Sequence, residues 1–259
     1  MGKTKALLLA AGLGTRLSPL TDIWPKCLMP IKNRPLLEYW LGILHKVDID
    51  NVLVNTHYYS VYVEDFLKQS HFKDWVHSVY EEKLLGTAGT LRKNADFFQD
   101  STVMMTHADN WTCCDFSDFL YHHNKRPKDT VMTMMTFTCP TPSSCGIIEL
   151  NDSGIVVGFH EKVDNPPGRL ANAAVYLIEP EVIEWIKNNP EITDFSTEVI
   201  PQFMGRISAW ENKNIHRDVG TIETLKEAQM DKCETPPWTE KSSWQQDFLS
   251  NPIHKLIAR

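Results

Sequence analysis

The sequence predicts an α/β fold built around a mainly parallel sheet. Apolar runs of strand length alternate with stretches whose apolar residues recur at helical spacing, which is typical of βαβ units. The first such run, residues 6–11, is apolar throughout, as expected of a parallel strand buried on both faces. The chain has 259 residues, which suits one α/β domain or one domain with a small appendage, and 42% of them are hydrophobic, enough for a large core.

The elements can be assigned in order along the chain. Residues 36–47 are predicted to be helical because Leu36, Trp40 and Leu44 would share one face. Pro180 is expected to open a helix, and the turn at residues 151–154 predicts a hairpin. Further strands are expected at 51–56, 77–80, 102–106, 130–138, 147–150, 155–161, 173–178 and 207–211. Further helices are expected at 59–67, 87–94, 115–124, 180–188, 196–203 and 222–231.

Charge and cysteine content narrow the class of protein. A net charge of −7 disfavours a general nucleic-acid-binding surface. The six cysteines have neither a CxxC pair nor zinc spacing, so we expect reduced thiols in a cytoplasmic protein. The apolar run near the N-terminus is too short for a secretory signal, and no segment is long enough to span a membrane.

A glycine loop with two nearby cations follows the first strand. Gly12 and Gly14 would let backbone N–H groups approach an anion, and Arg16 and Lys26 add fixed positive charge, a combination that suits a triphosphate. The P-loop pattern is excluded because the loop lacks its final Gly-Lys-Ser/Thr. The dinucleotide fingerprint is excluded because Leu17 stands where its third glycine belongs.

The whole string GLGTRLSPLTDIWPK resembles the signature of the sugar-1-phosphate nucleotidylyltransferases, over roughly residues 4–230. The resemblance implies a Rossmann-like nucleotidyltransferase domain, similar to the GT-A glycosyltransferases, with three layers and a mainly parallel central sheet. It implies that an NTP and a sugar 1-phosphate react to give an NDP-sugar and pyrophosphate. Residues 1–232 would form the catalytic domain, and residues 233–259 a tail packed on that domain or on a second subunit.

The resemblance also assigns residues to the nucleotide. Arg16, Lys26, Asp109 and Lys162 would be the catalytic groups. The segment LGTAGT resembles the family's base-and-ribose loop, whose glycines allow flat packing of the base. The residues expected to bind nucleotide are Ala10, Ala11, Gly12, Gly14, Thr15 and Arg16 in the first loop, and Gly86, Thr87, Ala88 and Gly89 in the second.

Two distant aspartates are candidate ligands of Mg²⁺. Asp109 follows the strand at 102–106 in the string HADN, where the family usually has Gly-Asp, and Asp218 lies in RDVGT, which resembles the family's Asp-Ile/Val-Gly-Thr. Each could instead cap a helix. Their joint presence favours one Mg²⁺ held by both carboxylates.

The sugar site is assigned by two weaker motifs. Glu161-Lys162 resembles the family's Glu-Lys-Pro, with Val163 in place of proline, and would bring Glu161 to the sugar hydroxyls and Lys162 to the sugar phosphate. Asn172 begins a segment that resembles Asn-Ala-Gly, with Ala174 in place of the glycine, and would hold the sugar. By itself a Glu-Lys pair more often marks a solvated strand edge.

The base and the sugar stay open at this stage. The LGTAG segment and the chain length look most like guanylyltransferases acting on mannose 1-phosphate or heptose 1-phosphate, but uridylyl- and thymidylyltransferases share these loops. A non-catalytic regulatory paralogue that binds NDP-sugar is the second class to consider, and a homodimer is also left open. A GT-A glycosyltransferase is disfavoured because that class lacks the glycine-loop string.

Overall fold

The computed structural model describes residues 3–239 and 242–257, and their contacts divide them into two compact units. The first unit comprises the described residues before Leu8 together with Leu85–Thr106 and Cys114–Asn214. The second comprises Leu8–Leu84, His107–Cys113 and the described chain from Ile215 onward. The described residues on both sides of position 232, the predicted end of the catalytic domain, therefore belong to the second unit.

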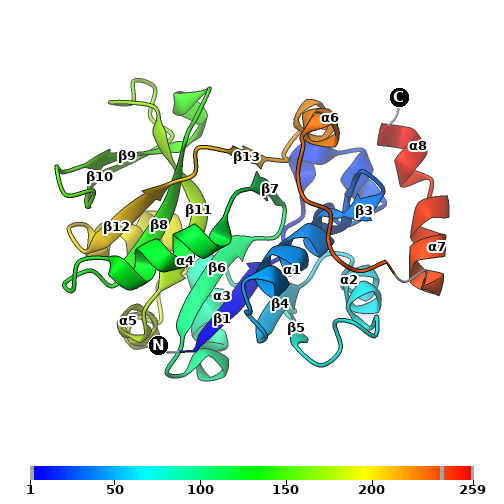
Figure 1. Ribbon diagram of the computed structural model, residues 1–259, viewed down its shortest axis with the longest axis horizontal. Coiled ribbons are helices and arrows are strands. Elements are labelled where there is room, and N and C mark those ends of the chain that lie inside the picture. Colours follow the sequence, from blue (N-terminus) through cyan, green and yellow to red (C-terminus); the bar gives the residue numbers. More distant parts are fainter. Residues whose placement is uncertain (1–2, 240–241, 258–259) are drawn as a thin grey trace. The chain divides into compact units, whose positions relative to one another are not determined.

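The first unit is built on a sheet in which β11 is central. Strand β11 pairs antiparallel with β6, β8 and β9, β10 extends the sheet beyond β9, and β12 lies parallel to β8. The strands are β6 (Thr102–His107), β8 (Met132–Thr138), β9 (Gly146–Leu150), β10 (Val156–Glu161), β11 (Leu170–Ile178) and β12 (Ile207–Glu211). The helices are α3 (Thr87–Lys93), η4 (Ala95–Phe98), α4 (Phe116–Lys125), η5 (Pro142–Ser144), α5 (Pro180–Asn188), η6 (Phe195–Val199) and η7 (Ile200–Phe203) (Figure 1).

The second unit receives the end of β1 (Thr4–Leu9) and places β4 and β5 in parallel. Its other strands form two short antiparallel pairs, β2 with β3 and β7 with β13. The strands are β2 (Pro30–Ile31), β3 (Arg34–Pro35), β4 (Val52–Thr56), β5 (Val76–Tyr80), β7 (Asn110–Cys113) and β13 (Ile215–Asp218). The helices are η1 (Thr15–Leu17), η2 (Leu20–Asp22), η3 (Lys26–Leu28), α1 (Leu36–Lys46), α2 (Ser60–Leu67), α6 (Ile222–Met230), α7 (Ser243–Ser250) and α8 (Ile253–Ile257).

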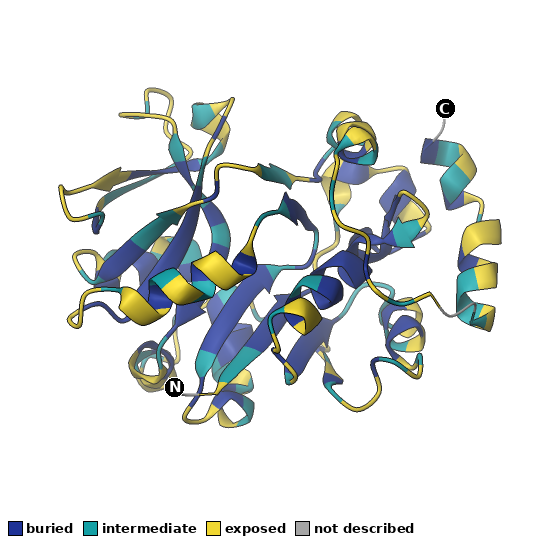
Figure 2. Ribbon diagram, viewed as in Figure 1, coloured by how far each residue is buried: buried dark blue, intermediate teal, exposed yellow. Residues whose placement is uncertain are grey.

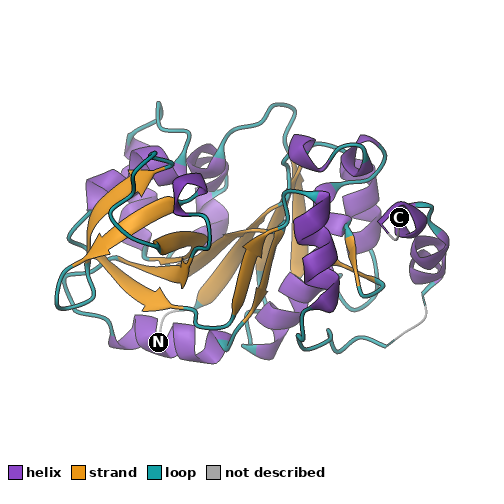
Figure 3. Cartoon of the chain, turned by 90° about the horizontal axis from the view of Figure 1, so that it is seen from above, coloured by secondary structure: helices purple, strands orange, loops and turns teal. Residues whose placement is uncertain are grey.

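The α/β class predicted from the sequence is confirmed, because helices and strands alternate along the chain (Figure 3). The apolar runs are the buried strands: β4 is buried throughout, and β1 is buried from Ala6 to Leu9 (Figure 2). Helix α1 buries Leu36, Trp40 and Leu44, as their spacing predicts. Burial is not confined to that face, because the helix also buries Leu37, Glu38, Tyr39, Leu41 and Gly42. Within the described residues, no helix combines the length and apolar character that a membrane crossing needs.

Several local features differ from the sequence expectations, among them helices α7 and α8 in the segment expected to be a tail. The helix expected at 196–203 is a π-helical turn, η6, followed by the 3-10 turn η7, which begins just before Pro201. Proline has no N–H to donate and its ring crowds the preceding turn, so a regular α-helix is disfavoured there. The strands β7 and β13 were not predicted, since four residues carry too little periodicity to indicate a strand.

The cysteines also depart from the expectation of six reduced thiols. The structure pairs Cys113 with Cys233 and Cys139 with Cys145, whereas Cys27 and Cys114 form no disulfide with a described residue. The first pair joins residues 120 apart in sequence, so spacing alone could not reveal it. Complete burial raises the pKa of Cys27 to about 12, with the charge of Asp109 adding to the rise, so this thiol stays neutral.

Candidate active site

A buried lysine lies at the centre of the second unit's charged cluster. The Nζ atom of Lys26 lies 2.7 Å from Asp109 Oδ2 and 3.2 Å from Asp218 Oδ1, and only 7% of the lysine side chain is exposed. A buried cation needs charged partners, and these two carboxylates supply them. The second unit therefore brings together three residues that lie far apart in the sequence and that the family resemblance singles out.

Arg16 joins this cluster from the solvent side. Its Nη2 atom donates to Asp218 Oδ2 at 2.5 Å. A Cβ atom at Gly220 would lie 2.7 Å from Arg16 Nη1, so the glycine of the Asp-Val-Gly motif makes room for the guanidinium. Partial burial raises the pKa of Asp218, but the charges and hydrogen bonds of Lys26 and Arg16 outweigh burial and lower the pKa below its usual value.

Pairing between β7 and β13 explains how the two aspartates meet. In this pair Asp218 lies opposite Asn110, so Asp109 is one residue away from the partner of Asp218. Neither aspartate caps a helix. Thr221 caps α6 in a capping box with Thr224, and Asp115 caps α4. The alternative that these two aspartates only cap helices is therefore excluded.

The donor set fits Mg²⁺ better than a structural metal. Magnesium is usually held by one or two carboxylates together with waters and substrate phosphates, and Asp109 and Asp218 supply two carboxylates. Among residues 3–239 and 242–257, no group of three or more His, Cys, Asp and Glu side chains could hold a metal ion.

The two glycines of the first loop have different roles. Gly14 has a φ of +66°, and a Cβ atom there would lie 2.9 Å from Thr21 Cγ2 and 3.0 Å from Lys26 Cβ, so the turn beside the lysine requires glycine. A Cβ atom at Gly12 would meet nothing within 4 Å, so this backbone faces open space.

The other residues of this loop that were predicted to bind nucleotide differ in their surroundings. The N–H of Ala10 donates to Asn55 Oδ1 at 2.7 Å. Ala11 is buried, whereas Thr15 is exposed at the start of η1.

The LGTAGT loop lies in the first unit and is tied to the segment before η6. The N–H groups of Ala88 and Gly89 donate to the carbonyl oxygen of Thr193, and Thr87 Oγ1 accepts from the N–H of Phe195. Gly86 has a φ of +75°, and a Cβ atom there would lie only 2.4 Å from Thr193 O. The glycine is thus needed for packing within the unit, and the loop's contact with nucleotide stays a prediction.

The predicted sugar-phosphate group lies at the edge of the first unit's sheet. Lys162 follows β10, its side chain is 67% exposed, and its Nζ atom lies 3.2 Å from Oε1 of the adjacent Glu161. Glu161 lies opposite Gly146 of β9, where a Cβ atom would come within 2.5 Å of Glu161 Oε2. Gly146, which sequence reasoning did not single out, therefore lets the carboxylate lie flat against the neighbouring strand.

The side chain of Asn172 is held in a bulge of β11. Its Nδ2 atom donates to Tyr176 Oη at 2.6 Å, and its Oδ1 atom accepts from the N–H of Ala174 at 2.9 Å. The pairing of β11 with β8 shifts register between Asn172 and Tyr176, and Ala174 has a φ of +54°. That left-handed conformation favours glycine, which explains why the family's Asn-Ala-Gly suits this bulge. Burial raises the pKa of Tyr176 to about 12, so its hydroxyl stays protonated.

Sequence reasoning missed the residues that hold Asp218 in place. Arg217 donates from Nε and Nη2 to the two carboxylate oxygens of Asp231, at 2.9 and 3.1 Å. Trp111 of β7 donates its Nε1–H to the same carboxylate at 2.9 Å. This bond network ties both strands of the β7–β13 pair to the chain after α6. An arginine directly before Asp218, the predicted metal ligand, was the available signal, but its partner lies 14 residues further on.

Comparison with known proteins identifies the family. The model of the nucleotidyl transferase family matches residues 5–235, which is most of the chain. This chain belongs to the nucleotidyl transferase family. The resemblance inferred from the glycine-loop string is thereby confirmed.

Two curated relatives in this family are named for sugar-1-phosphate substrates. A UTP–glucose-1-phosphate uridylyltransferase of Synechocystis is 30% identical over 216 residues, covering 77% of this chain and 55% of the relative. A mannose-1-phosphate guanylyltransferase of Mycobacterium tuberculosis is 29% identical over 223 residues, covering 84% of this chain and 61% of the relative. The chain thus spans between half and two thirds of the length of these relatives.

A solved structure supports the fold of this family member. The crystal structure of a Bacillus anthracis protein, provisionally named a glucose-1-phosphate thymidylyltransferase, matches with a TM-score of 0.78 at 20% identity. The match covers 94% of this chain and 99% of that one. The predicted nucleotidyltransferase fold is therefore confirmed.

Proposed function

We propose that this chain transfers a nucleotidyl group from an NTP to a sugar 1-phosphate and releases an NDP-sugar and pyrophosphate. The observation that carries the proposal is the cluster in which Lys26 contacts Asp109 and Asp218 while Arg16 contacts Asp218. Phosphoryl chemistry needs cations on the phosphates and carboxylates for a metal, and this cluster supplies both. Family membership supports the same conclusion.

The reaction requires no covalent intermediate on the protein. An oxygen of the sugar phosphate forms a bond to the α-phosphorus of the NTP, while the bond from that phosphorus to the bridging oxygen of pyrophosphate breaks. Pyrophosphate leaves with the electron pair. The chain's task is to hold two anions in line and to stabilise the negative charge that develops between them.

Each group in the site has a proposed part in this task. Lys26 and Arg16 bind triphosphate oxygens, and the open face of Gly12 lets the phosphates approach the backbone. Asp109 and Asp218 would hold Mg²⁺, which when bound neutralises charge on the phosphates. Lys162 binds the phosphate of the sugar, while Glu161 and Asn172 bind sugar hydroxyls.

We further propose GTP, with mannose 1-phosphate or heptose 1-phosphate, as the favoured substrate pair. This choice is supported by the LGTAG segment, and a relative named a mannose-1-phosphate guanylyltransferase agrees with it. Uridylyl or thymidylyl transfer is the alternative, because the Synechocystis relative is named for UTP and glucose 1-phosphate.

The test is pyrophosphate release by the purified chain with Mg²⁺, over a grid of four NTPs and several sugar 1-phosphates. We expect release only when both substrates are present, and the fastest release with GTP. Faster release with UTP or dTTP would correct the base and leave the reaction class intact. Binding of NDP-sugar without turnover in any combination would instead support the non-catalytic regulatory paralogue.

A further inference from the structure

The C-terminal segment, described at residues 236–239 and 242–257, lies beyond the family match, which ends at residue 235. It belongs entirely to the second unit, the unit that carries Lys26, Asp109 and Asp218. The segment is rich in aromatic side chains, and Phe248 and Ile253 are almost completely buried. The segment therefore packs within the same unit as the charged cluster.

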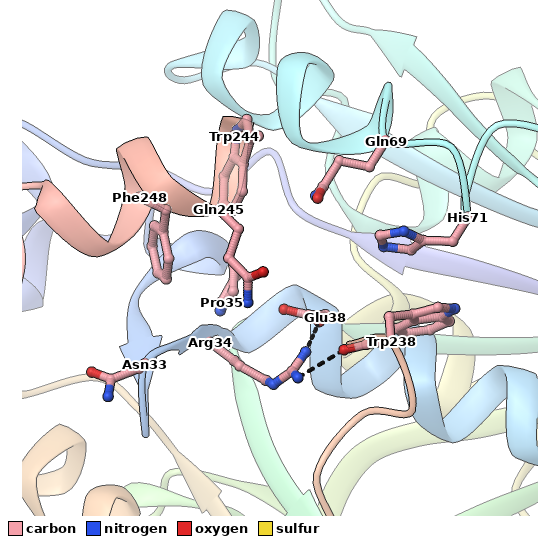
Figure 4. Close-up of a pocket in the computed structure, with 10 residues that line it drawn as sticks. All are labelled: Asn33, Arg34, Pro35, Glu38, Gln69, His71, Trp238, Trp244, Gln245 and Phe248. Atoms are coloured by element: carbon pink, nitrogen blue, oxygen red, sulfur yellow. Dashed lines mark hydrogen bonds and ion pairs between the residues drawn. The ribbon is translucent and has the colours of Figure 1, made fainter. Parts of the chain in front are cut away.

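Aromatic contacts and one charged hydrogen bond dock this segment. The Trp244 ring lies 4.9 Å from that of Phe66 on α2, and the Trp238 ring stacks on His71 at 5.1 Å. Arg34, which also pairs with Glu38, donates from Nη2 to the carbonyl oxygen of Trp238 at 2.7 Å (Figure 4). These contacts fix the segment at separate points along its length.

A small cavity lies where the segment meets α1 and β3, and Figure 4 shows the side chains around it. Its volume is about 10 Å³, room for roughly one water molecule. Among the described residues the buried Oε1 atom of Gln245 has no hydrogen-bond partner, which suits a single bound water rather than a substrate. The cavity thus marks a closely packed contact rather than a second binding site.

From this docked segment a chain of contacts leads to Lys26. The Phe248 ring stacks on Trp244 at 5.0 Å and lies 6.1 Å from the ring of Trp24. Trp24 in turn donates its Nε1–H to the carbonyl oxygen of Leu28 at 2.9 Å. That bond spans the η3 turn, Lys26–Leu28, so the indole holds the turn from which the Lys26 side chain projects.

A second contact supports the neighbouring turn. Helix α8 packs against η2, and both Ile253 of α8 and Leu20 of η2 are almost completely buried. The Oγ1 atom of Thr21 in η2 donates to the carbonyl oxygen of Gly14 at 3.0 Å. The segment thus contacts two elements that follow the glycine loop, Trp24 and η2, and η2 is hydrogen-bonded to Gly14 of that loop.

We propose that Phe248 is a positioning residue for nucleotidyl transfer, acting through Trp24 and the η3 turn on Lys26. The packed C-terminal segment then stabilises the η3 turn, and the turn positions the Lys26 ammonium between Asp109 and Asp218. The expected effect on kcat rests on the proposed function. The expected effect on the order of the η3 turn does not. Displacing a group that orients substrate by about 1 Å can cost on the order of 100-fold in rate.

The test compares Phe248→Ala with Leu249→Ala, a matched control because Leu249 is the next residue but is 49% exposed. Hydrogen exchange of residues 24–31 is measured together with kcat and KM. We expect Phe248→Ala to accelerate exchange at Leu28 and Met29, whose N–H groups close the η3 turn, and to lower kcat about tenfold or more. KM for the NTP should change less than kcat, and Phe248→Leu should restore most of both readouts.

A second variant distinguishes loss of support for the η3 turn from unfolding of the C-terminal segment. Trp24→Phe keeps a ring beside Phe248 but removes the hydrogen bond to Leu28, so exchange at Leu28 should rise while exchange across residues 243–250 stays as in the wild type. Unchanged exchange at 24–31 and unchanged kcat in Phe248→Ala would overturn the proposal, as would an equal effect of Leu249→Ala. If the wild-type chain transfers no nucleotide, the proposed function fails. The exchange data alone then decide whether Phe248 stabilises the η3 turn.

Discussion

The two lysines at the predicted phosphate sites lie in very different surroundings. Lys26, in the second unit, is 7% exposed and contacts carboxylates from two separate segments. Lys162, in the first unit, is 67% exposed and contacts only the neighbouring Glu161 among the ion pairs of the described residues. The comparison indicates that the fold already orders the proposed triphosphate site, whereas the lysine proposed to bind the sugar phosphate lies exposed at a strand edge.

The energetics of ion pairs support this distinction. An exposed pair contributes about 0–1 kcal/mol because solvent screens it. Removing one partner of a buried pair typically costs about 3–5 kcal/mol, since a charge is left without compensation. We therefore expect substitutions at the Lys26 cluster to affect stability and turnover together, and those at Lys162 to affect turnover alone.

The largest effect is expected from the two aspartates. Asp109→Asn and Asp218→Asn keep the side-chain shape but remove a carboxylate proposed to hold Mg²⁺, so kcat should fall by about 1,000-fold or more. Pyrophosphate release measured over a range of Mg²⁺ concentrations checks this. Asp115→Asn is the matched control, because Asp115 caps α4 and should leave turnover near the wild-type value. Full activity of either site variant at moderate Mg²⁺ would contradict a shared metal site.

Replacing Lys162 with methionine should have the next largest effect. Methionine keeps much of the apolar stem and loses the charge, so kcat/KM should fall by about 100-fold while NTP binding persists. Calorimetry with each substrate separates the two effects, and melting should be unchanged because the lysine is exposed. Lys68→Met removes a similarly exposed ion pair and serves as control. Weaker NTP binding with intact sugar-phosphate binding would refute the assignment of Lys162.

Alanine substitution of one glycine in each unit tests whether the two glycine loops differ in their effect on stability. Gly86→Ala should lower the free energy of unfolding by about 1–3 kcal/mol, because its φ is +75° and the new Cβ would meet Thr193 O. Gly12→Ala should change that free energy by less than about 0.5 kcal/mol, since nothing lies within 4 Å, yet weaken NTP binding. Urea unfolding and NTP titration measure both quantities. Equal destabilisation by the two variants would show that the loops do not differ in this way.

The smallest of these effects is expected at Arg16. Arg16→Lys keeps the charge but loses the planar fork that contacts Asp218, so kcat should fall by about tenfold with a smaller change in KM. Steady-state kinetics with varied NTP checks this expectation. Arg206→Lys, which alters an exposed bidentate pair with Glu181, is the control and should leave both constants unchanged. A change confined to KM would mean that Arg16 only binds substrate.

Sequence reasoning predicted the parts of this protein that depend on local pattern. The apolar run of β1 reflects a strand that is buried on both faces. The spacing of Leu36, Trp40 and Leu44 reflects a shared face of a helix. The glycine-loop string indicated the family for a related reason: it keeps several chemically specific residues within a short, contiguous stretch. Such features depend on neighbours along the chain and can be recognised without a fold.

The sequence by itself determined the fold class, the family and the identity of the charged groups. Only the tertiary structure decided that Lys26 lies between Asp109 and Asp218, because that arrangement depends on the β7–β13 pair. It likewise decided that Phe248 reaches Trp24 and that Cys113 meets Cys233. These contacts join residues more than 80 positions apart, and they form because burial and hydrogen bonding favour the compact chain as a whole. Such a contact leaves no periodic pattern in the sequence around either residue, so it could not be predicted from the sequence.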